Sequence, residues 1–454
     1  MGEVEVPAGS LYGASTQRAI RNFPVSGRGF GRGLIRAIGL VKRASAEANF
    51  ALRKLDAGRY QAICRSAEDV IEGNLDEHFV VDVFQTGSGT STNMNANEVI
   101  ANRASQLAGK PLGAKDPVHP NDHVNLGQSS NDVFPTAIHI AAAETLQNRL
   151  LPELIALQRS LETKSSEFDK VLKIGRTHLM DATPIRLGQE FSGYGRQMEK
   201  AVKRVEAATE ALLELPLGGT AVGTGLNTHP EFAAKAITFI AERTGLKFVE
   251  AENHFEAQGG RDALCEVSGQ LKTVAVSLFK VANDLRWMGS GPRCGLGELR
   301  LPALQPGSSI MPGKVNPVVC ESVMQVAAQV VGNDAAITWG AANGNLELNV
   351  MMPMMARNVL ESAELLANVS RIFRENVIDG LEADVERCRQ MVERSMALVT
   401  SLVPEIGYDR SAEIARIASE SGKTIREVCE ELEVLPPDRL AALLDGTTMT
   451  IPTG

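Results

Sequence analysis

The sequence LGQEFSGYGRQMEKAVKRVEAATEAL, residues 187–212, carries apolar side chains at alternating steps of four and three residues. The apolar positions are Leu187, Phe191, Tyr194, Met198, Ala201, Val205, Ala208 and Leu212. Spacing of this kind, sustained over three heptads, predicts a long α-helix that packs along one seam against other long helices. The stretch therefore predicts a mainly α fold built around a bundle of long helices.

Two further segments repeat this spacing before and after the first. The apolar positions are Leu146, Leu150, Leu154, Leu157 and Leu161 in one segment, and Leu264, Val267, Leu271, Val274, Leu278, Val281 and Leu285 in the other. Helical stretches at roughly 319–342 and 354–376 bring the number of long helices to five. A helix of about 30 residues spans about 45 Å, so five such helices expose long apolar seams unless several chains share them. The seams therefore predict a homo-oligomer.

Outside the bundle the patterns are shorter. Residues 2–7 alternate in polarity and predict a short strand, and residues 34–80 are rich in alanine and predict helix. Residues 85–95 are polar and glycine-spaced, and helix is predicted again only over 98–108. After Gly380 the pattern predicts small helices as far as Leu444. We therefore expect a mostly helical domain over 1–130, a long-helix bundle over 131–383 and a small helical domain over 384–454.

The composition excludes several classes of partner. The 454 residues carry 46 Lys and Arg against 55 Asp and Glu, a formal charge of −9, and no basic run stands out. Nucleic acid and anionic membranes are therefore poor partners. The six cysteines are scattered without a metal-binding spacing, which favours buried thiols in a reducing compartment. With no leader-like segment and no long apolar run, we expect a soluble cytoplasmic protein.

A second stretch, GSSIMPGKVNP at residues 307–317, combines glycines and prolines with two hydroxyls, an ammonium and an amide. Its glycines and prolines prevent a regular helix or strand. Successive backbone N–H groups in such a turn form a concavity that binds anions. An ordinary surface loop is the alternative. The residue types favour a mobile loop that closes over a small anionic substrate.

This second stretch resembles the signature of the fumarase/aspartase superfamily. Two more stretches resemble that family, GSGTSTNMN at residues 87–95 and the pair HPNDH and QSSND at residues 119–123 and 128–132. The resemblance covers essentially the whole chain and is strongest to the class II, metal-independent fumarases. It implies a three-domain fold in a homotetramer, whose central helices form a twenty-helix core and whose active sites each draw on three chains. It implies no cofactor.

The resemblance also implies a reaction, the reversible hydration of fumarate to (S)-malate in the tricarboxylic acid cycle. In the reverse direction a base removes a weakly acidic proton beside a carboxylate and leaves an aci-carboxylate, which requires aimed donors and a placed acid. By resemblance Ser308 is the base and His178 the acid/base residue. Glu321 orients that histidine, and Lys314 with the loop N–H groups stabilises the Ser308 alkoxide.

Binding of the substrate carboxylates falls by resemblance mainly to neutral donors, as a buried dianion requires. The implied residues are Ser88, Gly89, Thr90, Ser129, Ser130, Asn131, Thr177, Ser309, Lys314, Val315 and Asn316. A second, peripheral anion site is implied at His119, Pro120, Asn121 and Asp122. His119 and His123 are four residues apart, but Pro120 and the lack of a third soft ligand argue against a metal site.

The sequence leaves two functions to weigh against that of a fumarase. Ser91-Thr92 is a pairing typical of aspartases, and Leu126-Gly127 replaces a Lys-Ser pair common in the family, so an aspartate ammonia-lyase is one alternative. His178 and Ser130 differ from the Gln and Thr of aspartases and favour a fumarase. The other alternative is a catalytically silent structural protein, such as the lens crystallins related to argininosuccinate lyase. It predicts loss of the catalytic residues, which are all present.

Overall fold

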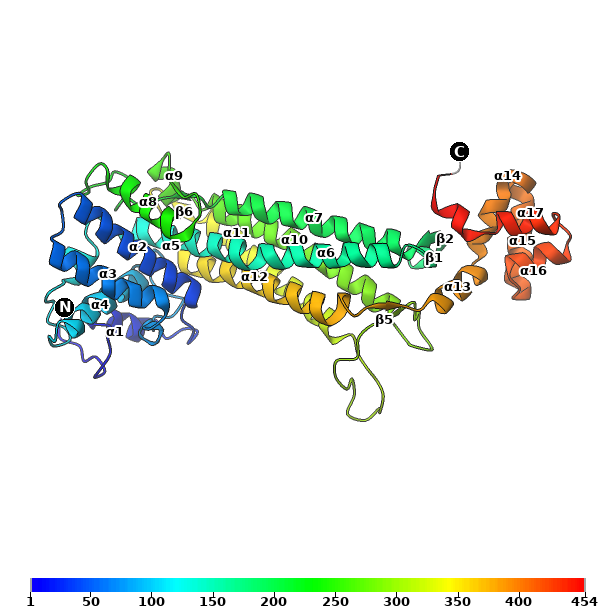
Figure 1. Ribbon diagram of the computed structural model, residues 1–454. Coiled ribbons are helices and arrows are strands. Elements are labelled where there is room, and N and C mark those ends of the chain that lie inside the picture. The colour runs from blue at the N-terminus through cyan, green and yellow to red at the C-terminus, as the bar shows by residue number, and fades with distance from the viewer. Residues whose placement is uncertain (1, 453–454) are drawn as a thin grey trace. The chain divides into compact units, whose positions relative to one another are not determined.

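The computed structural model describes residues 2–452, which form two compact units. Unit 1 comprises residues 2–152, Lys203–Ala275 and Ala328–Ala367, and unit 2 comprises Glu153–Val202, Val276–Ala327 and residues 368–452. Five long helices contribute residues to both units (Figure 1). They are α6 (Leu151–Glu167), α7 (Leu187–Glu210), α10 (Asp262–Met288), α11 (Val318–Ala342) and α12 (Met352–Phe373). The predicted mainly α fold with long helices is confirmed.

The predicted seams are buried along their whole length within the single chain, so the reasoning that other chains must cover them is wrong. Every seam position of α7 is at most 2% exposed, and every seam position of α10 is at most 1% exposed. Where a seam residue carries a polar atom, that atom has a partner, since the Tyr194 hydroxyl donates to Asp284 at 2.9 Å within unit 2. Burial of one apolar stripe per helix is what stabilises helices of this length, because propensity alone contributes little.

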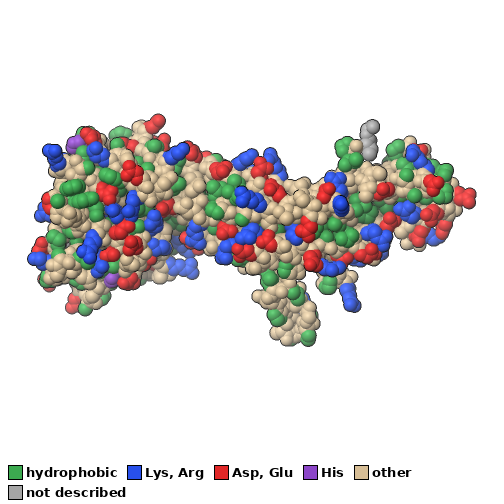
Figure 2. Space-filling model, viewed as in Figure 1, with side chains coloured by type: hydrophobic (Ala, Val, Ile, Leu, Met, Phe, Trp, Pro, Cys, Tyr) green, Lys and Arg blue, Asp and Glu red, His purple; other side chains and the backbone are tan. Residues whose placement is uncertain are grey.

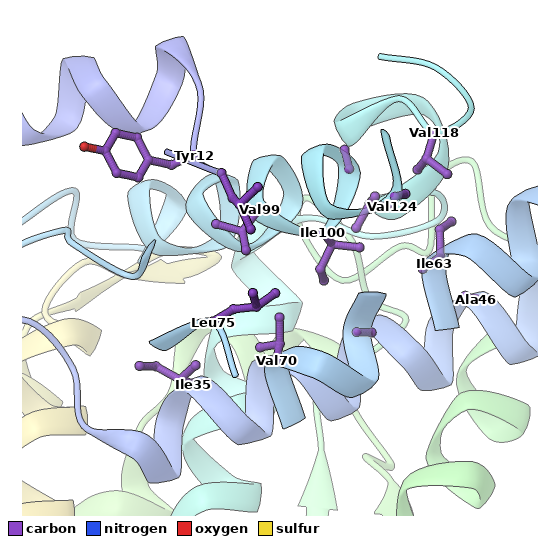
Figure 3. Packing of buried hydrophobic residues seen from close by; sticks show 14 of the residues in the cluster. Tyr12, Ile35, Ala46, Ile63, Val70, Leu75, Val99, Ile100, Val118 and Val124 are labelled. Atoms are coloured by element: carbon purple, nitrogen blue, oxygen red, sulfur yellow. The ribbon is translucent and has the colours of Figure 1, made fainter. Parts of the chain in front are cut away.

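Unit 1 is mostly helical, with two small sheets. Its elements are α1 (Ala14–Asn22), α2 (Arg32–Ala51), α3 (Ala57–Glu72), η1 (Asp76–His78), α4 (Thr90–Leu107), η2 (Pro120–Val124), α5 (Ser130–Thr145), η3 (Leu146–Leu150), β3 (Glu214–Leu215), α8 (Phe232–Thr244), β4 (Val249–Glu250), α9 (His254–Gly259), β6 (Gly344–Asn345) and β7 (Leu348–Asn349). Strands β3 and β4 pair in parallel, and β6 and β7 pair antiparallel. Figure 3 shows Ile35 of α2, Val70 of α3 and Val99 of α4 packed into one core.

Two sequence predictions for unit 1 are wrong. Residues 2–7 form no strand, and α4 begins at Thr90 rather than at residue 98. The first turns of α4 escaped prediction because Asn93, Asn95 and Asn97 point into buried polar surroundings, each at most 3% exposed. A helix whose buried face is polar lacks the apolar stripe by which amphipathic helices are recognised.

Unit 2 combines a hairpin with small C-terminal helices. Strands β1 (Leu172–Thr177) and β2 (Met180–Arg186) pair antiparallel, as do β5 (Leu299–Arg300) and β8 (Glu382–Ala383). After η4 (Arg374–Ile378) come α13 (Val385–Arg394), η5 (Met396–Leu402), α14 (Val403–Ile406), α15 (Tyr408–Ser421), α16 (Ile425–Glu431), α17 (Pro437–Leu443) and η6 (Gly446–Thr450). Ile174 of β1 shares a core with Val392, Ile414 and Ile425. The boundaries expected at 130/131 and 383/384 stay a prediction.

The surface is mixed in charge. Lys and Arg side chains are interspersed with Asp and Glu over the face shown in Figure 2, so no large field of one sign forms there. Within residues 2–452, none of the helices combines the length and the apolar character needed to cross a membrane. The first observation agrees with the absence of a basic run in the sequence, and the second with the absence of a long apolar run.

Candidate active site

The predicted site residues fall into two groups, one in each unit. Unit 1 holds Ser88, Gly89, Thr90, His119, Pro120, Asn121, Asp122, Ser129, Ser130 and Asn131. Unit 2 holds Thr177, His178, Ser308, Ser309, Lys314, Val315, Asn316 and Glu321. Each group has its own local geometry.

Hydroxyl groups from two helix starts are linked in unit 1. The Thr90 hydroxyl lies 2.8 Å from that of Ser88 and 2.6 Å from that of Ser130. Gly89, which precedes α4, has φ +74°, and a Cβ there would lie 2.2 Å from the ring of Phe134. Only glycine therefore brings the start of α4 this close to α5.

Gly87, two residues before Gly89, is equally constrained. A Cβ on Gly87 would lie 1.8 Å from the carbonyl oxygen of Val350, and the Gly87 carbonyl accepts a hydrogen bond from Met352 N–H at 3.2 Å. The chain before α4 is therefore held by the segment that leads into α12. This close approach fixes where Ser88 and Thr90 lie.

Asp132 organises the start of α5. The Ser129 side chain accepts from Asn131 N–H at 3.2 Å, and Asp132 Oδ1 accepts from Ser129 N–H at 2.9 Å, which forms a capping box. Asp132 Oδ2 accepts from the N–H groups of Gly218 and Thr220 at 3.0 and 2.9 Å. Burial raises the pKa of this fully buried carboxyl to about 6, against the opposing effect of these hydrogen bonds.

These groups line a cavity of about 530 Å³, here called the hydroxyl cavity. Its lining includes Thr90, Ser129 and Ser130 together with Asn121 and Asp122. The structure thus brings three predicted substrate-binding residues beside two residues of the predicted second anion site. Ser88, Asn131, His119 and Pro120 are not among the lining residues. Nearly all polar lining groups are neutral hydroxyls and amides, which suits binding of a carboxylate by hydrogen bonds.

A buried lysine lies behind the hydroxyl cavity. Lys42 is fully buried, and its Nζ donates to Asn125 Oδ1 and Gln128 Oε1, both at 2.9 Å. Asn125 and Gln128 both line the cavity. Burial lowers the pKa of Lys42 to about 7, and the negative charge of Asp132 opposes that effect. Lys42 therefore fixes the amides behind the predicted carboxylate site.

The two histidines of the HPNDH stretch serve the backbone. The Nδ1 of His123 accepts from His119 N–H at 2.8 Å, and the Nδ1 of His119 accepts from the N–H groups of Asn121 and Asp122 at 3.2 and 3.1 Å. These bonds hold the tight turn that presents Asn121 and Asp122. Across residues 2–452, no group of three or more His, Cys, Asp or Glu side chains is placed to hold a metal ion.

In unit 2, His178 stands at the tip of the β1–β2 hairpin. Thr177 pairs with Met180, so His178 and Leu179 form a two-residue turn, and both have left-handed backbone, with φ of 57° and 61°. This is the backbone that a tight hairpin requires, but it normally selects Gly or Asn. The turn leaves His178 exposed, with its imidazole free of hydrogen bonds within the described chain.

An ionic cluster anchors the base of this hairpin. Glu298 is fully buried, and both of its carboxylate oxygens accept from Arg176 Nη1 at 2.9 Å. Lys173, 2% exposed, lies 3.7 Å from Glu298 and 3.1 Å from Glu190. Lys173, Arg176, His178 and Glu190 line a cavity of about 400 Å³, here called the histidine cavity. The cluster thus fixes the strand that carries His178.

The 307–317 loop is held across its neck. Gly307 N–H donates to the Lys314 carbonyl at 2.7 Å, and the Asn316 amide donates to the Gly307 carbonyl at 2.9 Å. The Ser308 hydroxyl oxygen accepts from the N–H groups of Ile310 and Met311 at 3.2 and 3.1 Å. Two backbone donors therefore already point at this oxygen, which is how a nest stabilises negative charge.

The loop also borders a cavity of about 630 Å³, here called the loop cavity. Its lining includes Lys314, Val315, Asn316 and Glu321. Trp287 lines both the loop cavity and the histidine cavity. Ser308 and Ser309 are not among the lining residues of the loop cavity. Within residues 2–452 no hydrogen bond or ion pair joins His178 to Glu321 or to Ser308. The predicted acid and base are therefore not in contact within one chain.

Comparison with known proteins identifies the family. The chain matches the family model described as "Lyase" over residues 2–332 and the model described as "Fumarase C C-terminus" over residues 398–451. It is 57% identical to the class II fumarate hydratase of Halobacterium salinarum over 450 residues, which cover 99% of this chain and 96% of that protein. It belongs to the class II fumarate hydratase family. The predicted family is therefore confirmed.

Similarity to a second class II fumarate hydratase and to a solved fumarase structure supports the same family assignment. The protein of Corynebacterium glutamicum is 54% identical over 441 residues, 97% of this chain and 92% of that one. A crystal structure of recombinant class II fumarase from Schistosoma mansoni superposes with a TM-score of 0.96 at 40% identity, covering 100% of this chain and 98% of that one. These likenesses confirm the fumarase/aspartase fold, and they do not favour the aspartase alternative raised by Ser91-Thr92.

Some polar residues beside the class II fumarate hydratase motifs were not predicted from the sequence. Lys42, Lys173, Glu190 and Glu298 lie outside the recognised stretches. For Lys42 a signal exists, because it shares the buried face of α2 with apolar residues, where an unpaired lysine is too costly. For Glu298 the sequence gives no comparable signal, since its partner Arg176 is 122 residues away.

Proposed function

We propose that the chain catalyses the reversible hydration of fumarate to (S)-malate as a hydro-lyase. The likeness that carries this proposal extends over nearly the full length of the chain, to relatives named class II fumarate hydratase at 57% and 54% identity. The motif residues that a fumarase requires are all present. No step of the proposed chemistry requires a metal or a cofactor.

In the proposed mechanism Ser308 removes the C3 proton of malate. A serine hydroxyl is a poor base unless its alkoxide is stabilised. Support for such stabilisation comes from the two backbone N–H groups that donate to the Ser308 oxygen. Lys314, from the same loop, adds a positive charge close to the dianion. Loss of one such donor typically costs about 10²–10³ in rate.

His178 is proposed to exchange the proton of the hydroxyl at C2 through a water molecule. Histidine is the side chain most often used as a general acid or base. Glu321 is proposed to orient it, and the absence of a contact between the two in one chain favours contribution from different subunits. The hydroxyls of Thr90 and Ser130, with Asn131, are proposed to bind a substrate carboxylate, and the resulting aci-carboxylate is held by these neutral donors.

The active form is proposed to be a homotetramer in which several chains complete each site. The sedimentation mass is then about four times 48.7 kDa. Mixing Ser308→Ala subunits with His178→Asn subunits restores part of the activity, because some hybrid sites draw both intact residues from different chains. An active monomer contradicts this arrangement. The six cysteines are free thiols in the structure, which supports the proposed cytoplasmic location. The proposed role in the tricarboxylic acid cycle rests on the proposed reaction alone.

The decisive experiment separates Ser308 from its neighbour. Ser308→Ala lowers kcat by about 10²–10⁴, because it removes the proton acceptor and leaves carboxylate binding largely intact. Ser309→Ala, the matched control, mainly raises KM. Isotope exchange at C3 of malate measures the proton step directly. Exchange by Ser308→Ala at the parent rate excludes Ser308 as the base, and addition of ammonia to fumarate faster than hydration excludes the proposed reaction itself.

A further inference from the structure

The arginines of helix α13 lie on different sides of the helix. Arg387 and Arg394 are seven residues apart, two turns of helix, and therefore lie on the same side of α13. Both line a cavity of about 370 Å³, here called the arginine cavity. Arg389 lies on a different side, is not among the lining residues, and pairs with Glu386 at 2.9 Å. The two arginines that face the cavity are thus the ones without such a pair.

Neither guanidinium group forms an ion pair within residues 2–452, although the Asp384 carboxylate interacts electrostatically with Arg387. Arg387 donates from Nε to the Leu296 carbonyl at 2.9 Å and from Nη2 to the Gly295 carbonyl at 3.0 Å, which leaves Nη1 available. Arg394 is exposed and makes no hydrogen bond or ion pair within residues 2–452. The two backbone bonds hold Arg387 in place, so its orientation toward the cavity is preorganised.

The hairpin that carries His178 also contributes to the lining of the arginine cavity. The residues that it contributes are Arg176, Leu179 and Asp181. The lining residues together carry three positive charges and one negative charge, and Glu298 outside the lining neutralises that of Arg176. The excess positive charge therefore lies on the α13 side, with one carboxylate, Asp181, facing it.

We propose that the arginine cavity binds a small multivalent phosphate anion of the size of pyrophosphate. Guanidinium groups present paired donors that match phosphate oxygens, whereas carboxylates in the hydroxyl cavity meet neutral hydroxyls and amides. Two guanidinium groups on one side of α13 match an anion with more than one phosphoryl group, and the charge of Asp181 opposes its binding. The arginine cavity does not share Thr90, Ser130, Ser308 or Lys314, but Arg176, Leu179 and Leu296 line both it and the histidine cavity.

Direct binding of pyrophosphate to the intact protein at constant ionic strength tests the proposal. Calorimetry or ³¹P NMR is expected to show saturable binding, one per chain, in the millimolar range or tighter. Arg394→Gln weakens this binding about 3- to 10-fold, the modest size reflecting the exposure of that side chain. Arg389→Gln on the same helix is the matched control and changes the affinity less than 2-fold.

Two further measurements separate this cavity from the other anion sites. Asp181→Asn removes the one opposing charge and tightens pyrophosphate binding, the reverse of the Arg394 effect. Saturating malate leaves pyrophosphate binding unchanged, because the two ligands use different residues. The proposal is wrong if malate displaces pyrophosphate, if Arg394→Gln and Arg389→Gln behave alike, or if no saturable binding is found. Loss of hydratase activity in these variants is scored separately and does not bear on binding.

Discussion

Replacement of Glu298 by Gln tests how the hairpin that carries His178 is held. The change keeps the shape of the side chain but removes its charge at a position that is fully buried. Lys173 keeps Glu190 as a counter-charge at 3.1 Å, whereas Arg176 loses its only carboxylate partner within residues 2–452. Breaking one partner of a buried ion pair costs about 3–5 kcal/mol.

The expected cost lies at the lower end of that range. The Arg176 side chain is 14% exposed, and the new amide oxygen still accepts one hydrogen bond. A loss of about 3 kcal/mol corresponds to about a hundredfold change in a local opening equilibrium. Hydrogen exchange measured by mass spectrometry on residues 172–186 therefore accelerates about a hundredfold, while α4 exchanges at its parent rate. Global unfolding is a poor measure here, since a large oligomer rarely unfolds in two states.

The control and the partner variant make this prediction specific. Glu393→Gln breaks a half-exposed pair with Arg426 at 3.4 Å, which contributes less than about 1 kcal/mol, and leaves hairpin exchange unchanged. Adding Arg176→Met to Glu298→Gln recovers part of the protection, because the uncompensated charge is then removed as well. If hairpin exchange in Glu298→Gln stays within about threefold of the parent rate, the anchoring role is refuted. At about 1.4 kcal/mol per tenfold, such a change in rate corresponds to well under the expected loss of about 3 kcal/mol.

Two further predictions concern unit 1. Burial, aided by the charge of Arg261, lowers the pKa of His139 to about 4, below the ordinary value near 6.5. The folded state therefore disfavours the protonated imidazole, and the stability of the fold decreases as the pH drops from about 6.5 to 4. The loss approaches about 3 kcal/mol, and His139→Gln removes it. Hydrogen-exchange protection of α5, corrected for the intrinsic effect of pH and compared at pH 7 and pH 4.5, measures the loss locally. Parallel losses of protection in both proteins argue against His139. Gly89→Ala forces a Cβ into the ring of Phe134 and raises KM for fumarate at least about tenfold. Gly31→Ala is the control, because a Cβ there meets nothing within 4 Å, and it leaves the steady-state kinetics unchanged. Equal KM values for the two variants contradict the close-approach argument.

The apolar periodicity was sufficient to predict the long helices. In α7 the steps of four and three residues mark side chains that are all buried, because an apolar stripe is a local property of one helix. The start of α4 was missed for the opposite reason, since its buried face carries asparagines rather than apolar groups. Periodicity detects burial only where burial is apolar.

The site was predictable where a motif is contiguous in the sequence. Ser308 and Lys314 lie in one loop, and Ser129 and Ser130 at one helix start, so recognising the stretch located the residues. The turn at His178 and Leu179 was not predictable, because neither residue is of the type that left-handed backbone selects. The sharing of one cavity by Thr90 and Asn121 depends on tertiary packing, and no local pattern reports it.

The hydrogen bond between Gly87 and Met352 also limits how early unit 1 can finish folding during translation. Their sequence positions are 265 residues apart, and Gly87 has no room for any other residue once the chain around Val350 is in place. At about 5–20 residues per second, a ribosome needs roughly 13–53 s to reach the second partner after making the first. Throughout that interval the start of α4 lacks its final neighbour, so unit 1 cannot be completed while most of the chain is still being made. A chain released before residue 352 therefore lacks the segment that holds the start of α4, and its N-terminal half is not a smaller functional unit.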